Sequence, residues 1–152
     1  MPFLRSLAGQ ENTVTGDLYV STFGGGTATT EFEVLTGDTT AFLPYGASPY
    51  QMYVKNALPV MVSGLAEQGY QTVSLHPYRA TSWNRQQVYE RFGFAEQLYE
   101  DDFGEDDTER IRSYISDSAD YNKIIEVYKY TDCSLYTFDA ADEGLCVDLR
   151  GN

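Results

Sequence analysis

Three consecutive glycines, Gly24 to Gly26, run directly into Thr27 and a short segment of helical character that ends at Gly37. The preceding residues, 18–23, are β-branched and aromatic, which predicts a strand. Glycines let the backbone approach a ligand closely, and the first turn of a helix offers N–H groups to an anion. This order of elements predicts a phosphate site, with the Thr27 hydroxyl placed to attack phosphorus or to bind a metal.

Two other glycine-rich loops do not fit this stretch. A Walker A loop ends in Gly-Lys-Ser/Thr, and no lysine occurs before Gly37. The dinucleotide-binding pattern needs a glycine at position 29, which is Thr29. A glycine turn that simply caps a helix, without any ligand, remains an alternative.

The charge of the chain restricts its partners. With 152 residues the chain has the size of one domain, and its net charge of −13 argues against nucleic-acid binding through phosphate neutralisation. No apolar run reaches the length of a membrane span. The acidic run at 100–109 lacks the residue order of an EF-hand, so we expect a solvated loop and helix start.

Alternating strands and helices predict an α/β layered fold with a mostly parallel sheet. In such sheets, ligands bind at the carboxyl ends of the strands. Residues 39–53 are expected to form an aromatic-rich loop, and the apolar stripe of the last helix is expected to comprise Tyr121, Ile124, Ile125 and Tyr128. Helices are predicted near residues 3–7, 27–36, 58–66, 84–92 and 118–130, and strands at 18–23, 70–75 and 135–138.

A second group of polar residues follows the strand predicted at 70–75. It contains His76, the only histidine, Trp83, the only tryptophan, and Arg85. A guanidinium group binds phosphate in a bidentate way, a histidine donates or transfers a proton, and an indole N–H suits a glycerol or sugar. A core histidine, a packing tryptophan and a surface arginine are the alternative interpretation.

Residues 24–37 resemble the nucleophile segment of the lipoteichoic acid synthase-like, sulfatase-type enzymes of the alkaline phosphatase superfamily. The resemblance implies a three-layer alkaline phosphatase-like fold, present here incompletely, with Thr27 as nucleophile and metal ligand. His76, Trp83 and Arg85 match the residues that line the glycerol-phosphate pocket of that family, and Gly26 is expected to bind the substrate with them. The implied cofactor is Mn²⁺ or Mg²⁺, and the implied substrate is a glycerol-phosphate lipid or polymer, or another phosphate or sulfate ester.

The chain departs from this family in several places. Tyr78 stands where the synthases have an acidic residue, which leaves the substrate open. Neither the family's acidic metal ligand before Thr27 nor its Asp-His pair is found, so we expect a partial domain over 1–130 and an atypical tail over 131–152. We therefore expect a weakly bound or absent metal and little or no turnover. The resemblance also implies the extracellular face of a bacterial membrane, although the chain shows no anchor or signal.

Two alternatives remain for the function. The first is a formylglycine-dependent sulfatase, but Cys146 to Arg150 has the ends of the C/S-x-P-x-R motif without its proline. The second is a non-catalytic acidic α/β domain that binds an anion at the helix start of Gly26 and Thr27. A disulfide between Cys133 and Cys146 is not decided by the sequence.

Overall fold

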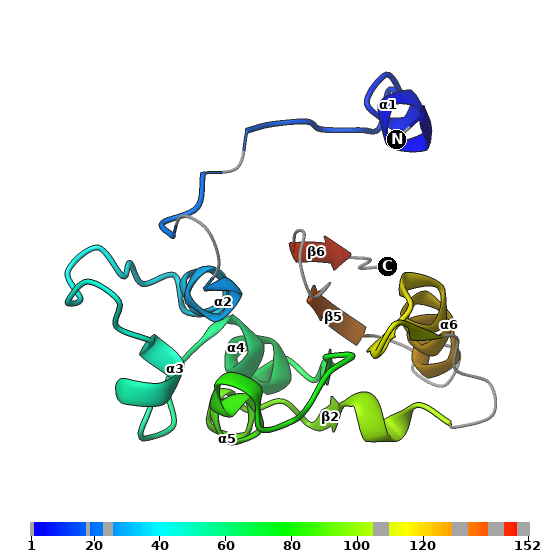
Figure 1. Ribbon diagram of the computed structural model, residues 1–152. Coiled ribbons are helices and arrows are strands. Elements are labelled where there is room, and N and C mark those ends of the chain that lie inside the picture. Colours follow the sequence, from blue (N-terminus) through cyan, green and yellow to red (C-terminus); the bar gives the residue numbers. More distant parts are fainter. Residues whose placement is uncertain are drawn as a thin grey trace.

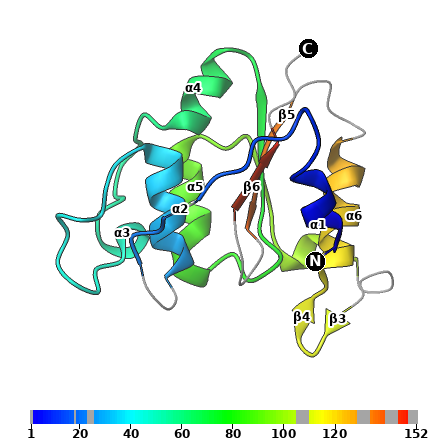
Figure 2. The ribbon, with the colours of Figure 1, turned by 90° about the horizontal axis from the view of Figure 1, so that it is seen from above.

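The computed structural model describes residues 2–17, 19–22, 26–104, 110–128, 134–139 and 145–148, and the side chains of most of them. A central sheet lies between two layers of helices, with α2, α3, α4 and α5 on one side and α6 on the other (Figures 1 and 2). The helices are α1 (Pro2–Leu7), α2 (Thr27–Thr36), α3 (Pro49–Met52), α4 (Met61–Glu67), α5 (Arg85–Phe92) and α6 (Asp117–Tyr128), with short 3-10 turns η1 (Ser82–Asn84) and η2 (Glu100–Asp102).

The sheet has the strand order β2-β1-β5-β6. Strand β1 (Gln71–Leu75) pairs in parallel with β2 (Glu96–Leu98) and with β5 (Ser134–Asp139), whereas β6 (Leu145–Asp148) pairs antiparallel to β5. A separate small ribbon joins β3 (Arg110–Ile111) to β4 (Tyr114–Ile115). The prediction of a mostly parallel sheet in an α/β fold is confirmed.

The larger hydrophobic cluster lies among α2, α3, α4 and α5. It forms because these helices place apolar residues at helical spacing on one face, as Val88 and Phe92 do on α5. Burial of such a face supplies most of the stability of a short helix. The fully or nearly buried members are Ala28, Phe32, Leu35, Tyr50, Val54, Val60, Val62, Val88, Tyr89, Phe92, Phe94 and Tyr99.

The smaller hydrophobic cluster covers the opposite face of the sheet. Val73 and Leu75 of β1 meet Leu98, Phe103 and Ile115 there, and α6 packs against them. The alternate residues of β1, Thr72 and Ser74, are also buried. A parallel strand covered on both faces is expected to be buried at every position.

The helix predictions are confirmed for α1, α2, α4, α5 and α6, and the strand predictions for β1 and β5. The prediction of a strand over 18–23 is wrong for the part that the structure describes, since residues 19–22 are irregular. Tyr19 is 89% exposed and Val20 is about half exposed, so no packing favours an extended pair there. β-propensity reflects burial and cross-strand packing as much as the backbone.

Two further predictions need correction. The loop at 39–53 contains the short helix α3, and only Tyr50 of its aromatic residues is buried. On α6, Tyr121 and Ile125 are exposed, whereas Ile124 and Val127 pack on the sheet. The buried face follows Asp120, Ile124 and Val127, at spacings of four and three residues, so the helix is rotated from the predicted stripe.

Helix α1 stands away from the sheet and the other helices in Figure 1. In the part of the chain that the structure describes, no helix combines the length and the apolar character needed to span a membrane. The undecided disulfide of Cys133 and Cys146 concerns side chains outside the described ones. The division of the chain at residue 130 stays a prediction, and β5 and β6 both follow it in sequence.

Candidate active site

The start of α2 combines a glycine turn with an exposed hydroxyl. Gly26 has φ 82° and ψ 35°, the left-handed conformation that disfavours residues with a Cβ. Its carbonyl accepts a hydrogen bond from the Thr29 N–H at 2.8 Å, which begins the helix, and Thr27 follows as the first helical residue. Thr27 is exposed. The N-cap residue is Gly26, which has no side chain to cap α2, and the first turn contains no acidic residue. The positive end of such a helix favours a negative charge.

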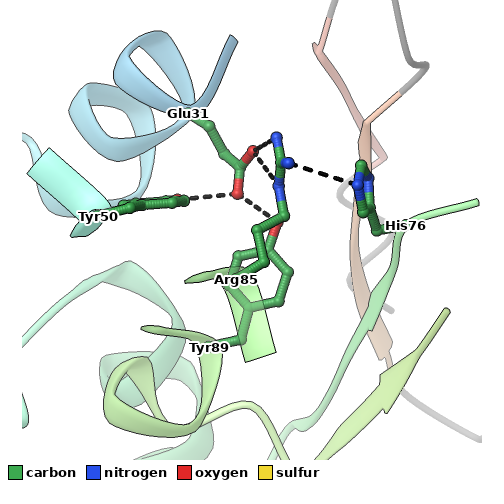
Figure 3. Close-up of polar contacts among 5 residues, drawn as sticks. All are labelled: Glu31, Tyr50, His76, Arg85 and Tyr89. Carbon is green, nitrogen blue, oxygen red and sulfur yellow. Dashed lines mark hydrogen bonds and ion pairs between the residues drawn. The ribbon is translucent and has the colours of Figure 1, made fainter. Parts of the chain in front are cut away.

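One turn further along α2, the buried carboxylate of Glu31 gathers four hydrogen bonds. Arg85 donates to Oε2 through Nε at 3.1 Å and through Nη2 at 2.9 Å, forming an ion pair. The Tyr50 hydroxyl donates to Oε1 at 2.8 Å, and the Tyr89 hydroxyl donates to the same oxygen. Figure 3 shows these side chains arranged around Glu31. The carboxylate thus joins α2 to α3 and α5.

His76 lies directly after β1, at the carboxyl end of a parallel strand, as predicted for a site residue. Its Nε2 is 3.4 Å from Nη1 of Arg85, on the side of the guanidinium away from Glu31 (Figure 3). Burial, and then the positive charge of Arg85, lower the pKa of His76 to about 3. The imidazole is neutral near pH 7, and because arginine only donates, Nε2 is the acceptor and Nδ1 carries the proton.

Trp83 and Asn84 form a strained turn that leads into α5. Both have positive φ values, 55° for Trp83 and 63° for Asn84, which L-residues seldom adopt. Such backbone strain often occurs at functional sites, where the surrounding structure holds it. The indole of Trp83 is 39% exposed, so its aromatic surface is available to a ligand two residues before Arg85.

The described structure brings Arg85 and His76 into contact and places Trp83 in the turn η1, two residues before Arg85. Arg85 is 2% exposed and His76 is 4% exposed, so neither is a surface residue in this conformation. Thr27 and Glu31 are four residues apart on α2 and share one face, which puts Thr27 one turn from the carboxylate that binds Arg85. The roles assigned to these residues stay predictions.

Sequence reasoning missed Glu31, Tyr50 and Tyr89. A signal for two of them was present, since Thr27 and Glu31, like Arg85 and Tyr89, stand at the i,i+4 spacing of one helix face. Burial, together with the charge of Glu31, raises the pKa of the Tyr50 hydroxyl well above its ordinary value. This hydroxyl therefore keeps its proton and donates to the carboxylate.

Metal ligands do not cluster in the described part of the chain. No group of three or more histidine, cysteine, aspartate or glutamate side chains gathers among the described residues in a way that would hold a metal ion. Thr27 alone does not hold a divalent ion against water, because Mg²⁺ and similar ions need several oxygen ligands. The described donors therefore do not fit a complete metal site.

The fold and the sequence together define the class of this protein. The Sulfatase family matches residues 1–136, so the chain belongs to the sulfatase family. Its fold resembles the lipoteichoic acid synthase LtaP of Listeria monocytogenes, with a TM-score of 0.66 and 25% identity over 78% of this chain and 28% of that one. It also resembles the Streptococcus pyogenes phosphoglycerol transferase GacH, solved with sn-glycerol-1-phosphate, with a TM-score of 0.61 and 24% identity over 88% of this chain and 38% of that one.

Two curated relatives match a large part of the chain. A putative cyclic β-1,2-glucan modification protein of Rhizobium meliloti (strain 1021) is 44% identical over 94 residues, which cover 62% of this chain and 14% of the relative. A protein of Haemophilus influenzae is 32% identical over 106 residues, covering 68% of this chain and 19% of that protein. The chain thus spans less than a fifth of the length of either relative.

These similarities confirm the resemblance to lipoteichoic acid synthase-like, sulfatase-type enzymes and the alkaline phosphatase-like α/β fold. They also confirm a sulfatase-like character for the chain. The threonine nucleophile, the metal and the substrate stay predictions.

Proposed function

We propose that this chain carries the nucleophile segment and the phosphate-binding segment of a phosphoglycerol transferase, or of a related sulfatase-like hydrolase. The observation that carries the proposal is the exposed Thr27 hydroxyl at the uncapped start of α2, directly after the left-handed Gly26, in a chain of the sulfatase family. The likeness to the phosphoglycerol transferase GacH, solved with sn-glycerol-1-phosphate, and to the lipoteichoic acid synthase LtaP favours a glycerol-phosphate lipid or polymer as donor. The R. meliloti relative makes a glucan a natural acceptor to test.

In this proposal Oγ of Thr27 attacks the phosphorus of a phosphoglycerol ester. The new Oγ–P bond forms as the bond from phosphorus to the leaving alkoxide breaks, and the hydroxyl proton passes through water to that alkoxide. Backbone N–H groups of the first turn of α2 stabilise the charge on the phosphoryl oxygens, with Gly26 letting the ester approach the backbone. Arg85, His76 and Trp83 hold the phosphoglycerol group, which requires Arg85 and His76, 2% and 4% exposed in this structure, to become accessible to the ester.

Proteins of the sulfatase family generally use a divalent metal ion. Such an ion, Mn²⁺ or Mg²⁺, would lower the pKa of the attacking hydroxyl, with Thr27 as one ligand. Because the described residues lack a set of three carboxylate, histidine or cysteine donors, we expect weak metal binding and little or no steady turnover from this chain. The extracellular face of a bacterial membrane is the proposed location, by likeness to the synthases.

The second candidate function is anion binding without chemistry. The lack of a cluster of three metal donors among the described residues favours it, since a threonine hydroxyl is a poor nucleophile without a metal or base. In that case the start of α2 binds a phosphate ester, and binding does not depend on a metal.

The two candidates differ in the product found on Thr27. The purified chain is incubated with a phosphatidylglycerol donor and excess Mn²⁺, and modified residues are mapped by mass spectrometry. Phosphoglycerol on Thr27, absent from Thr27→Ala and retained in the matched variant Thr30→Ala, supports the transferase. Metal-independent binding of glycerol phosphate with Thr27 unmodified supports the binding domain, and robust multiple turnover would contradict the expectation of an incomplete metal site.

A further inference from the structure

We propose that Glu31 is a positioning residue, which fixes the orientation of Arg85 so that its Nη1 edge faces His76. The inference rests on the proposed function, because it concerns the group that holds the phosphoglycerol phosphate. Glu31 does not touch the substrate. It acts through the guanidinium, and Tyr50 and Tyr89 in turn fix Glu31.

The geometry of the carboxylate carries the first step. Oε2 of Glu31 accepts hydrogen bonds from Nε and Nη2 of Arg85, and Oε1 accepts them from the two tyrosine hydroxyls. Each carboxylate oxygen therefore has two donors. Glu31 is 5% exposed, and a buried carboxylate with four donors has little freedom to rotate. The side chains come from three helices, so the orientation is set by the packed core (Figure 3).

The planarity of arginine carries the second step. A guanidinium is a rigid fork, so holding the edge formed by Nε and Nη2 also sets the direction of Nη1. In the structure Nη1 points at Nε2 of His76, 3.4 Å away. Glu31 therefore occupies one edge of Arg85 and leaves Nη1 directed at His76, the other residue that the proposed function assigns to the phosphate.

This arrangement predicts that neutralising Glu31 changes anion binding in the direction opposite to the usual one. Removal of a negative charge near an anion site normally strengthens anion binding, since the local repulsion falls. If Glu31 positions Arg85, neutralising Glu31 weakens anion binding instead. Glu33 provides the matched control, because it lies on the same helix and its carboxylate binds Thr40 instead of Arg85.

The test compares Glu31→Gln with Glu33→Gln in the chain of 152 residues. Binding of sn-glycerol-1-phosphate is followed by the fluorescence of Trp83, the only tryptophan. We expect roughly tenfold weaker binding for Glu31→Gln, the loss of one charge-assisted interaction, and unchanged or slightly tighter binding for Glu33→Gln. Equal or tighter binding by a folded Glu31→Gln overturns the inference, whereas no binding by the unmodified chain overturns the phosphate-binding proposal first and this inference with it.

Two further variants separate positioning from stability. Should circular dichroism show that Glu31→Gln is unfolded, Tyr89→Phe decides, since it removes only one hydroxyl from the carboxylate; weaker binding supports the inference and unchanged binding refutes it. In an Arg85→Lys background the planar guanidinium is gone, so Glu31 has no group to orient. A folded double variant with Glu31→Gln is therefore expected to bind as weakly as Arg85→Lys alone. The same loss in both backgrounds would assign Glu31 a structural role only.

Discussion

Neutralising Glu31 is expected to destabilise the fold strongly. Glu31→Gln keeps the volume of the side chain but removes the negative charge that is ion-paired with Arg85, whose side chain is only 2% exposed. Removing one partner of a buried ion pair costs about 3–5 kcal/mol. Whole domains are stable by roughly 5–15 kcal/mol, so this single change removes a large share of the total.

Urea unfolding measures this loss, with Trp83 fluorescence and far-UV circular dichroism as independent probes. At a slope of about 2 kcal/mol per molar urea, the midpoint falls by roughly 2 M. Glu33→Gln, whose carboxylate is half-buried and bound by Thr40, is expected to lose at most about 1 kcal/mol. Equal losses for the two variants would show that the contacts of Glu31 with Arg85, Tyr50 and Tyr89 contribute no more than those of Glu33 with Thr40.

Three smaller perturbations test other parts of the structure. Burial and the Arg85 charge lower the pKa of His76 to about 3, whereas an exposed histidine has a pKa near 6.5. At pH values between these two, the unfolded chain binds a proton at His76 that the folded chain does not. His76 should therefore make the unfolding free energy fall by about 1.4 kcal/mol per pH unit as pH drops from 6 toward 4, a contribution that His76→Asn should remove from urea titrations at each pH. Asn84→Gly relieves a φ of 63° and should stabilise the protein by up to about 1 kcal/mol, seen as a higher melting temperature. Thr81→Gly, at an ordinary φ of −77°, should lower the melting temperature, and the reverse order would refute the strain at Asn84. Gly26→Ala forces a Cβ into a φ of 82° and should cost about 1–2 kcal/mol in urea unfolding, while Gly64→Ala inside α4 should be neutral or stabilising; an unchanged midpoint for Gly26→Ala would contradict the left-handed turn.

The helices were predictable because their signals are local. Helix α2 is flanked by Gly26 at its start and Gly37 at its end, and the structure gives both glycines a left-handed conformation. Helix α5 likewise ends at Gly93, with a φ of 85°. The predicted strand before Gly24 failed in its described part because a strand needs a partner, and composition does not reveal whether a partner is adjacent.

The polar network of the site was not predictable from spacing alone. His76 and Arg85 were found because they follow one strand and lie close in sequence. Glu31 binds Arg85 across 54 residues and Tyr50 across 19, and such pairs depend on how the helices pack. The sequence shows that Arg85 is suited to phosphate, but not that one edge of its guanidinium is already occupied by a carboxylate.

The proposed phosphate site at the start of α2 is tested most directly by a ¹⁵N NMR titration of the chain with sn-glycerol-1-phosphate. We expect the largest shifts at the amides of Thr27 and Ala28 and at the indole N–H of Trp83, because those donors would face the bound ester. Sulfate should compete for the same amides, and glycerol alone should not. Saturable binding that leaves these three signals unmoved and shifts resonances elsewhere would contradict the assignment of Thr27 to the reaction centre.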